Sequence, residues 1–209
     1  DAFDLRLTAV LQDIKADGPT EAESDPDTLK TLYGRPTLSQ YVPTVSDVDY
    51  RIYNGVLNYD LGSATLTAST SYSRQNQTKR DDATFNLSGL IQAVLGPAND
   101  LYLGQKTNNR KYTQEVRLAS NAGARFDWLI GGYFTDEKGL IHQEYIAVQP
   151  GTLTQLSGLP LLADLDLNSR YKEYAGFANM TLRLTERLDL DVGGRYSHNK
   201  QTASQSAEG

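Results

Sequence analysis

The sequence predicts an all-β fold, a segment of a large antiparallel, up-and-down transmembrane β-barrel with about seven strands, short turns at one end and long loops at the other. Three observations predict it. Apolar and polar residues alternate with a period of two along several long segments. Short polar turns alternate with long connections, and aromatic side chains lie towards the ends of the expected strands.

Composition excludes several other classes of protein. The mean hydropathy of the 209 residues is -0.50, and no run of about 18 apolar residues occurs, which excludes membrane-spanning helices. Barrel strands are only half apolar, so this composition is compatible with them. The chain has no cysteine, so a disulfide scaffold, a thiolate metal site and a cysteine nucleophile are excluded. The net charge of -6 and the lack of a basic stripe along the sequence argue against a nucleic-acid partner.

Four segments show the alternation clearly. From Ala64 to Ser73, one set of alternate positions holds alanine, leucine, threonine and tyrosine, and the other holds only serine and threonine. A strand places these two sets on opposite faces, whereas a helix would scatter them around its axis. The same pattern occurs in Phe3–Gln12, Tyr112–Leu118 and Leu188–Ser197. Three further strands with less regular faces are expected in Tyr50–Gly62, Phe126–Lys138 and Tyr174–Leu184.

The connections between these strands are of two kinds. Short polar stretches read as tight hairpin turns at Tyr59–Ala64, Ser120–Phe126 and Leu184–Leu188. Long connections lie between the hairpins, at Lys15–Asp49, Thr78–Arg110 and Ala147–Asn168. Within the second long connection, Phe85–Gly96 could form a short helix.

Strand length and face chemistry favour a membrane barrel over a soluble β-sandwich. The expected strands have about 10 residues or more, whereas soluble strands average about 5 or 6. Burying Asp189, Asp191 and Arg195 in a dry core would cost a large desolvation free energy, whereas the lumen of a wide barrel would leave them solvated. The loop asymmetry is also typical of outer-membrane barrels, which have short periplasmic turns and long extracellular loops.

Two stretches resemble the barrels of TonB-dependent receptors. In Tyr112–Lys138, "QEVRLAS" precedes a short turn and the aromatic-rich strand "DWLIGGYF". In Tyr174–Lys200, a strand with a phenylalanine precedes a Thr-Glu-Arg turn and a strand that ends in Gly-Gly-Arg-Tyr. A third, weaker match is "YDLGSATLTASTSYS". These motifs identify architecture and carry no information on the transported ligand.

The resemblance implies a function for a longer protein. Residues 1–209 would be part of the barrel domain, with the plug domain and the remaining strands absent. The whole receptor would lie in the outer membrane of a Gram-negative bacterium, among its lipids. It would bind a scarce nutrient, an iron–siderophore complex being one class, and import it with energy delivered by the TonB complex through an N-terminal part. Ligand contacts would come from the three long connections, with no individual ligand-binding residue assigned.

Sequence reasoning assigns no catalytic, cofactor-binding or metal-binding residue, no cofactor, and no enzymatic activity. His142 and His198 are expected to be solvated, since only Glu144 lies near His142 along the chain. The carboxylate pairs Asp81–Asp82 and Asp136–Glu137 should point to opposite faces, so neither makes an acid/base pair. The acidic stretch Glu21–Asp27 lacks the spacing of a calcium loop and should be an outer loop.

Other notable residues have structural interpretations. Several charged residues are expected to point into the lumen near the short turns and to brace the wall: Glu115, Arg117, Arg183, Asp189, Asp191 and Arg195. Glycines inside strands are expected to permit curvature or close aromatic packing, namely Gly131, Gly132, Gly193 and Gly194. The glycosylation patterns at Asn76, Asn86 and Asn179 are expected to be coincidental.

Two alternatives to a receptor remain open at this point. A passive porin would have the same barrel without a plug, and would show steady ion conductance. A soluble all-β binding or adhesion module would bury its apolar faces between two sheets and behave as a stable monomer in plain buffer.

Overall fold

The computed structural model describes residues 3–18, 21–87, 89, 93, 99–121, 125–158 and 161–208. The predicted helix within Phe85–Gly96 lies largely outside them. The sheet strands are β1 (Phe3–Asp17), β2 (Val45–Asp60), β3 (Ala64–Asp82), β4 (Asp100–Ser120), β5 (Phe126–Val148), β6 (Leu161–Thr185) and β7 (Leu188–Glu208). Among the described residues, no helix has the length and apolar character needed to cross a membrane.

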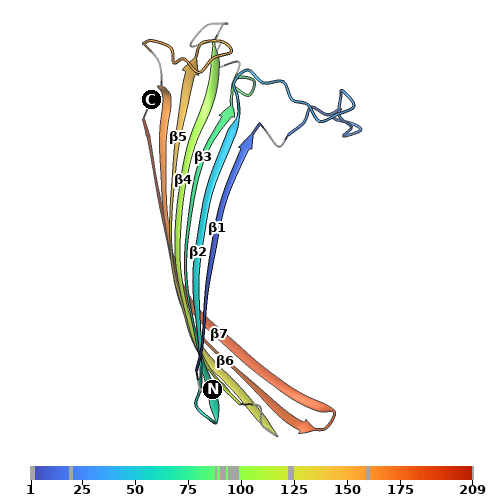
Figure 1. Ribbon diagram of the computed structural model, residues 1–209, viewed down its shortest axis with the longest axis vertical. Helices are drawn as coiled ribbons and strands as arrows, with labels where there is room; N and C mark the ends of the chain where they lie inside the picture. The colour runs from blue at the N-terminus through green and yellow to red at the C-terminus, as the bar shows by residue number, and fades with distance from the viewer. Residues whose placement is uncertain are drawn as a thin grey trace.

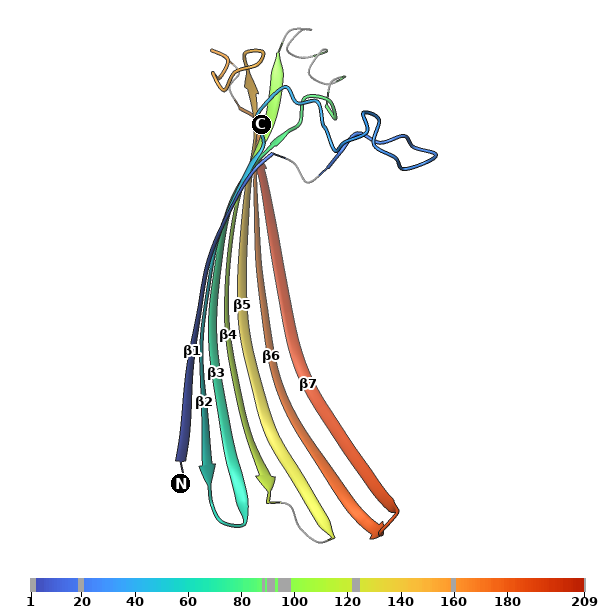
Figure 2. The same ribbon diagram turned by 45° about the vertical axis from the view of Figure 1, so that its right-hand side comes forward.

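All seven strands form one antiparallel sheet in chain order, as the sequence predicts. Figures 1 and 2 show a long, bent sheet with the three long connections gathered at one end, called the loop end here. The opposite end, the turn end, carries the short connections. The β2–β3 turn is closed by Leu61 N donating to Ala64 O at 2.8 Å, with Gly62 at a positive φ of 85°. The central residues 122–124 of the β4–β5 turn are not among the described ones.

The long connections are shorter than predicted, because the strands continue beyond the alternating segments. They cover residues 18–44, 83–99 and 149–160, in place of Lys15–Asp49, Thr78–Arg110 and Ala147–Asn168. Near the loop end both faces of a strand are polar, for example at Thr78, Lys79 and Arg80. A backbone ladder needs no apolar side chains, so pairing continues after the hydrophobic period has disappeared.

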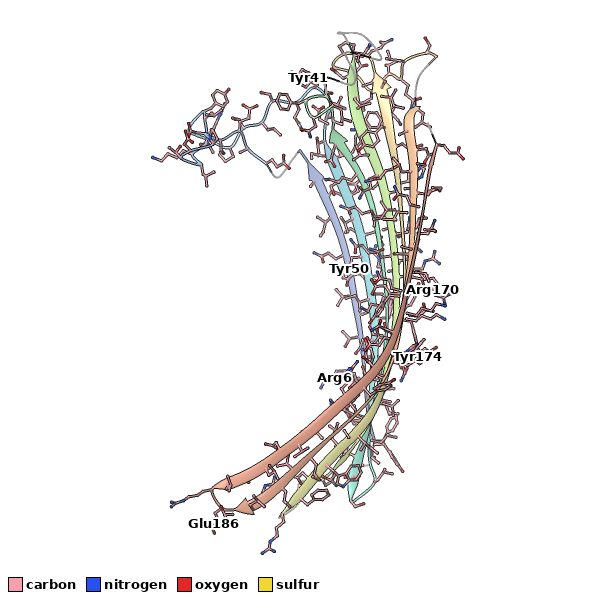
Figure 3. The ribbon with its side chains drawn as sticks, turned by 180° about the vertical axis from the view of Figure 1, so that it is seen from behind. Arg6, Tyr41, Tyr50, Arg170, Tyr174 and Glu186 are labelled. Atoms are coloured by element: carbon pink, nitrogen blue, oxygen red, sulfur yellow. The ribbon has the colours of Figure 1, made fainter. Side chains whose placement is uncertain are left out.

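The bend of the sheet gives it a convex and a concave face. In Figure 3, Arg170 and Tyr174 lie on the convex side, and Arg6 and Tyr50 on the concave side. Residues that are paired across neighbouring strands lie on the same face of the sheet. Because neighbouring residues of a strand alternate between the faces, the register places every residue of the sheet on one face or the other. The predicted faces are confirmed. For example, the paired series Leu5, Leu57, Ala68 and Val116 crosses four strands on one face.

The convex face is apolar and exposed from the turn end to a row of aromatic rings. Large side chains on it remain open on every strand, including Leu7 at 75% and Val192 at 52%. Soluble monomers rarely expose so continuous an apolar surface, which lipid would cover in a membrane. We define the aromatic belt as Tyr53, Tyr72, Tyr112, Phe134, Tyr174 and Tyr196.

The belt marks the end of the membrane-spanning segment on the loop side. Its rings contact one another, with centroids 6.1 Å apart for Tyr112 and Phe134 and 4.8 Å apart for Phe134 and Tyr174. Amphipathic rings of this kind gather where hydrocarbon meets polar headgroups. Each strand from β2 to β7 continues beyond the belt towards the loop end.

Gly131 allows an aromatic ring to lie on the concave face. A Cβ at Gly131 would stand 2.3 Å from Cζ of Phe177, its cross-strand partner on β6. The predicted close aromatic packing is therefore confirmed at this glycine.

We expect Gly131→Ala to destabilise the full-length barrel by about 1–3 kcal/mol, because Phe177 must move away. The control is the neighbouring Gly132→Ala, whose added Cβ meets nothing closer than Ala175 O at 3.9 Å. Urea unfolding from lipid vesicles measures both. Equal effects of the two substitutions would contradict the packing argument.

Candidate functional site at the loop end

Most of the buried residues of the described chain lie at the loop end, where the connections pack on both faces of the sheet. On the convex side, Val42 of the β1–β2 connection packs with Ile146 and Val148 of β5, against Tyr102. On the concave side, Ala83, Leu101 and Ala147 form a second cluster, which Leu87 and Leu156 of the other two connections cover. Val42 and Leu101 are fully buried. The bases of all three connections are thus tied to the sheet.

Two aspartates fasten these connections through backbone N–H groups. The Asp82 carboxylate accepts from Tyr41 N at 2.6 Å, Val42 N at 3.1 Å and Thr84 N at 3.0 Å. The buried Asp100 carboxylate accepts from Gly151 N at 2.6 Å. Short, charge-assisted hydrogen bonds of this kind are about twice as strong as neutral ones. These hydrogen bonds fix the backbone at the bases of the connections, which we call the platform, and the outer parts of the connections extend from it.

Arg80 strengthens the same platform on the convex side. Its Nε donates to Pro43 O at 2.8 Å, and its guanidinium lies 5.9 Å from the centre of the Tyr102 ring. The neighbouring residue Asp81 points to the concave face and pairs with Lys79 at 2.6 Å. The predicted separation of Asp81 and Asp82 onto opposite faces is confirmed, because their contacts lie on opposite sides of β3.

The acidic stretch Glu21–Asp27 lies in the outer part of the β1–β2 connection, which projects away from the sheet (Figure 1). The Asp25 carboxylate accepts from Thr28 N at 2.8 Å and from Asp27 N at 3.1 Å, and these bonds lower its pKa. Ser39 N donates to Glu23 at 3.1 Å and lowers the pKa of that carboxyl. The two carboxylates therefore shape the connection itself.

The concave wall near the turn end carries the predicted charge network, with partners that the sequence did not identify. Arg183 pairs with Asp127 at 2.5 Å, and Thr181 donates to Asp191 at 2.5 Å. Asp189 is the cross-strand neighbour of Arg183. Arg117 lies 3.9 Å from Glu115 on the same strand.

Arg195 belongs to a second group, closer to the level of the aromatic belt. It pairs with Glu173 at 2.8 Å and lies 5.2 Å from the centre of the Tyr133 ring. Glu173 also accepts from the Tyr171 hydroxyl at 2.9 Å. With the charges near the turn end, these groups place polar side chains at two levels of the concave face of β5, β6 and β7, which a water-filled or plug-filled lumen would solvate.

His142 has more partners than the sequence predicts. Its side chain is 27% exposed and is surrounded by carboxylates from two strands. Nδ1 lies 2.9 Å from Asp166 and 3.3 Å from Asp164 of β6, and Nε2 lies 3.6 Å from Glu144. Only Glu144 is near in the sequence, and the β5–β6 register brings the other two.

The ligand atoms of His142, Glu144 and Asp164 lie within 4.8 Å of one another, close enough for one divalent metal ion. These three residues lie on the convex face beyond the aromatic belt. His142 is the cross-strand partner of Lys106 on β4. His198, by contrast, is exposed and opposite Tyr174 on β6. Asp136 and Glu137 point to opposite faces as predicted, pairing with Arg170 at 2.7 Å and Lys111 at 3.1 Å.

The surroundings of His142 predict its titration. The hydrogen bond to Asp166 raises the pKa of His142 above its ordinary value of 6.5, and the charges of Asp164 and Glu144 add to this, while partial burial opposes it. Because the folded-state pKa is the higher one, the stabilisation is complete below the unfolded pKa. It is lost as pH rises through the folded-state pKa. NMR titration of the full-length protein with a chelator present should show the raised pKa.

Asp166→Asn is the matched variant for this titration. We expect it to lower the pKa of His142 towards the ordinary value, because the hydrogen bond to a charged carboxylate is lost. An unchanged titration of His142 in this variant would contradict the assigned cause.

The apolar convex face and the polar concave face are those of the wall of a membrane β-barrel. The anchored connections at the loop end form one rim of that wall. The family described as "TonB dependent receptor-like, beta-barrel" matches residues 4–209, and the chain belongs to this family. No curated protein sequence matches the chain significantly.

A similar solved structure is the ferric yersiniabactin uptake receptor FyuA from Yersinia pestis. It matches with a TM-score of 0.71 and 14% identity. The match covers 99% of this chain and 28% of that chain. The likeness confirms the fold, and this chain spans less than a third of that structure. The family and fold are those of receptors and transporters rather than enzymes.

Proposed function

We propose that this chain is part of a receptor in the outer membrane of a Gram-negative bacterium, which imports a scarce nutrient with energy delivered by TonB. The observation that carries the proposal is membership of the receptor family over residues 4–209. The full-length protein would add the remaining strands and a plug domain, and TonB would act through an N-terminal part.

The geometry of the chain supports a receptor in three respects. The exposed apolar convex face needs lipid, which argues against the soluble alternative. The concave face is polar and charged, as the lining of a wide, filled barrel would be. The three connections are anchored at one end by Asp82, Asp100 and two buried clusters, so that their outer parts can meet a ligand.

Ferric siderophores are the first class of ligand to test, because the similar Yersinia pestis structure is named as the uptake receptor for one. Deleting the full-length gene should abolish uptake of radioactive iron supplied as its cognate ferric siderophore. Uptake should return with the wild-type gene and stop when the inner membrane is depolarised, since the proposed import needs energy.

Two outcomes would overturn parts of the proposal. Uptake that survives depolarisation, together with steady ion conductance of the purified protein in a planar bilayer, would favour a passive porin. Energy-dependent uptake of a different nutrient, with no uptake of any ferric siderophore, would reject the iron assignment alone.

A further inference from the structure

Four side chains of β5 and β6 come together on the convex face near the loop end. His142 and Glu144 are two residues apart on β5 and point to the same face, as do Asp164 and Asp166 on β6. The register pairs His142 with Asp166 and Glu144 with Asp164, so the four residues form a two-by-two group. We call this group the β5–β6 cluster. The backbone hydrogen bonds of the sheet hold its members at fixed positions.

The β5–β6 cluster carries more negative charge than its own residues neutralise. Three carboxylates surround one imidazole, and a protonated His142 leaves an excess of negative charge. In the part of the chain that the structure describes, neither a lysine nor an arginine forms an ion pair with these carboxylates. Glu208 of β7 lies opposite Asp164 and extends the row of acids. Like charges placed directly opposite each other destabilise a sheet, so a bound cation stabilises this part of it.

The ligand atoms are spaced for one metal ion. Zinc binds imidazole nitrogen and carboxylate oxygen at about 2.0–2.2 Å, which separates two ligand atoms of a tetrahedral site by about 3.4 Å. His142 Nε2 lies 3.6 Å from Glu144 Oε1, close to that value. Asp164 Oδ1 lies nearer to Nδ1, at 3.3 Å, and reaches the same ion by rotation of its side chain. The ligand atoms of the three residues already lie within 4.8 Å of one another.

Asp166 holds the imidazole in the orientation of a metal ligand. Nδ1 of His142 lies 2.9 Å from the Asp166 carboxylate. A carboxylate only accepts, so Nδ1 carries the proton and the lone pair of the neutral ring is on Nε2. Histidines that bind metal commonly donate their other ring N–H to a carboxylate, which fixes the ring and makes it a stronger ligand. Asp166 is therefore a positioning residue, and the three other members of the cluster supply the ligand atoms.

The β5–β6 cluster lies far from the lipid-facing part of the sheet. Phe134 of the aromatic belt comes eight residues before His142 on β5, about 26 Å along the strand. The His142 side chain is 27% exposed there, so a dissolved ion can reach it. The β5–β6 connection, residues 149–160, begins and ends close by. The register also shifts between Tyr145 and Ile146, directly after the cluster, so a metal ion would join the two strands where their regular pairing ends.

We propose that the β5–β6 cluster binds one divalent transition-metal ion, of which zinc is the representative, through His142 Nε2, Glu144 and Asp164. The imidazole decides the class of metal, because magnesium and calcium prefer oxygen ligands alone. The bound ion neutralises the opposed carboxylates and links β5 to β6 at the base of their connection. The cluster is on the convex face, away from the lumen, so the inference goes beyond the proposed receptor function and requires no particular nutrient.

Calorimetric titration of the purified full-length protein with Zn²⁺, after removal of metal by a chelator, tests the proposal. We expect His142→Ala to bind one zinc ion fewer than the wild type. Ca²⁺ at the same concentration should leave zinc binding unchanged, since imidazole selects the transition metal. Equal zinc binding by the wild type and His142→Ala would overturn the proposal. Displacement of the zinc by an equal concentration of Ca²⁺ would overturn it as well.

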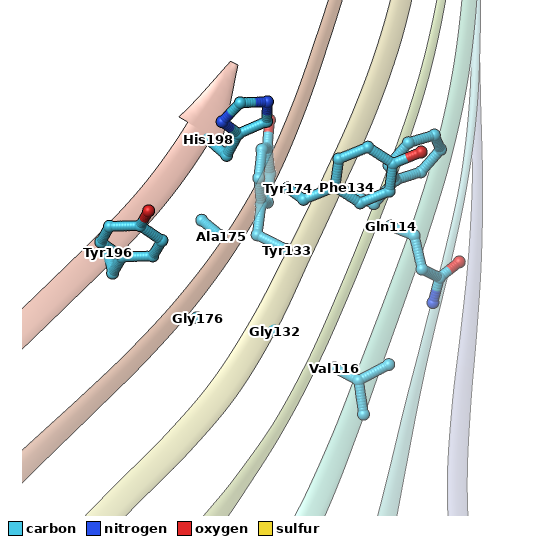
Figure 4. Close-up of a pocket in the computed structure, with 10 residues that line it drawn as sticks. All are labelled: Gln114, Val116, Gly132, Tyr133, Phe134, Tyr174, Ala175, Gly176, Tyr196 and His198. Atoms are coloured by element: carbon cyan, nitrogen blue, oxygen red, sulfur yellow. The ribbon is translucent and has the colours of Figure 1, made fainter.

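His198→Ala is the matched control, because it removes the other of the two histidines of this chain. Figure 4 shows His198 on β7 near Tyr174 and Tyr196, at the level of the aromatic belt. We expect His198→Ala to bind as much zinc as the wild type does. A loss in this variant equal to that in His142→Ala would mean that an exposed histidine suffices, and would reject the cluster.

Asp166→Ala tests the positioning role. We expect the affinity for zinc to fall about 10- to 100-fold with the number of bound ions unchanged, and Asp166→Glu to recover part of the loss. The visible absorption of bound Co²⁺ should persist in Asp166→Ala at saturating metal and be lost in His142→Ala. An unchanged zinc affinity in Asp166→Ala would show that Asp166 does not position the ring. Heat-modifiable migration on a gel establishes that each variant is folded.

Discussion

Ala68→Arg is expected to destabilise the folded, membrane-inserted protein by about 2–4 kcal/mol. Ala68 lies in the middle of the apolar part of β3, on the convex face, directly between Leu57 of β2 and Val116 of β4. An arginine there must place its guanidinium in hydrocarbon or reach a distant interface. Unfolding of the full-length protein from lipid vesicles, followed by heat-modifiability, gives the measurement.

Ser69→Arg is the matched control, because Ser69 is the next residue of the same strand and points to the concave face. Its arginine would enter the polar lumen, so we expect a change well below that of Ala68→Arg. A second control, Ala68→Leu, keeps the site apolar and should leave the protein stable. Equal destabilisation by the two arginines would mean that the convex face does not contact lipid.

Asp82→Ala is expected to release the base of the β1–β2 connection from the sheet. The carboxylate holds three backbone N–H groups, from Tyr41, Val42 and Thr84, and hydrogen bonds to charged groups contribute about 1.5–3 kcal/mol each. Since water can replace part of this, we expect a net loss of about 2–3 kcal/mol in docking. The docking equilibrium would then shift roughly 30- to 150-fold.

Limited proteolysis of the intact receptor measures this change, with faster cleavage expected between residues 21 and 42. Asp81→Ala is the matched control, because it removes the adjacent carboxylate and its pair with Lys79 on the concave face. We expect Asp81→Ala to leave the cleavage rate near that of the wild type. If both variants are cleaved at the same rate, Asp82 does not anchor the connection.

The strands and their faces could be predicted from the sequence because period-two alternation is a local property. In β3 the alternation from Ala64 to Ser73 directly reflects lipid on one side and polar surroundings on the other. The short turns were equally readable, since glycine and polar residues interrupt the pattern there. Beyond the aromatic belt both faces are polar, so the pattern ends before the strand does. For this reason the predicted connections were too long.

The sites depended on register, which joins residues that are distant along the chain. Asp166 is paired with His142 across β5 and β6, and nothing near His142 in the sequence indicates it. The same holds for Asp82 and Asp100, because their hydrogen-bond donors, Tyr41 N and Gly151 N, are distant from them along the chain.

The sequence by itself determined the all-β class, the seven strands, their apolar and polar faces and the positions of the short turns, because each depends on neighbouring residues alone. Tertiary structure decided which side chains meet. A shift of one residue in the pairing of β5 with β6 would send the side chains of one strand to the other face and separate His142 from Asp164 and Asp166. In the short hairpins the turn fixes the register, but β5 and β6 are joined by a long connection, so their register depends on matching the apolar faces of whole strands.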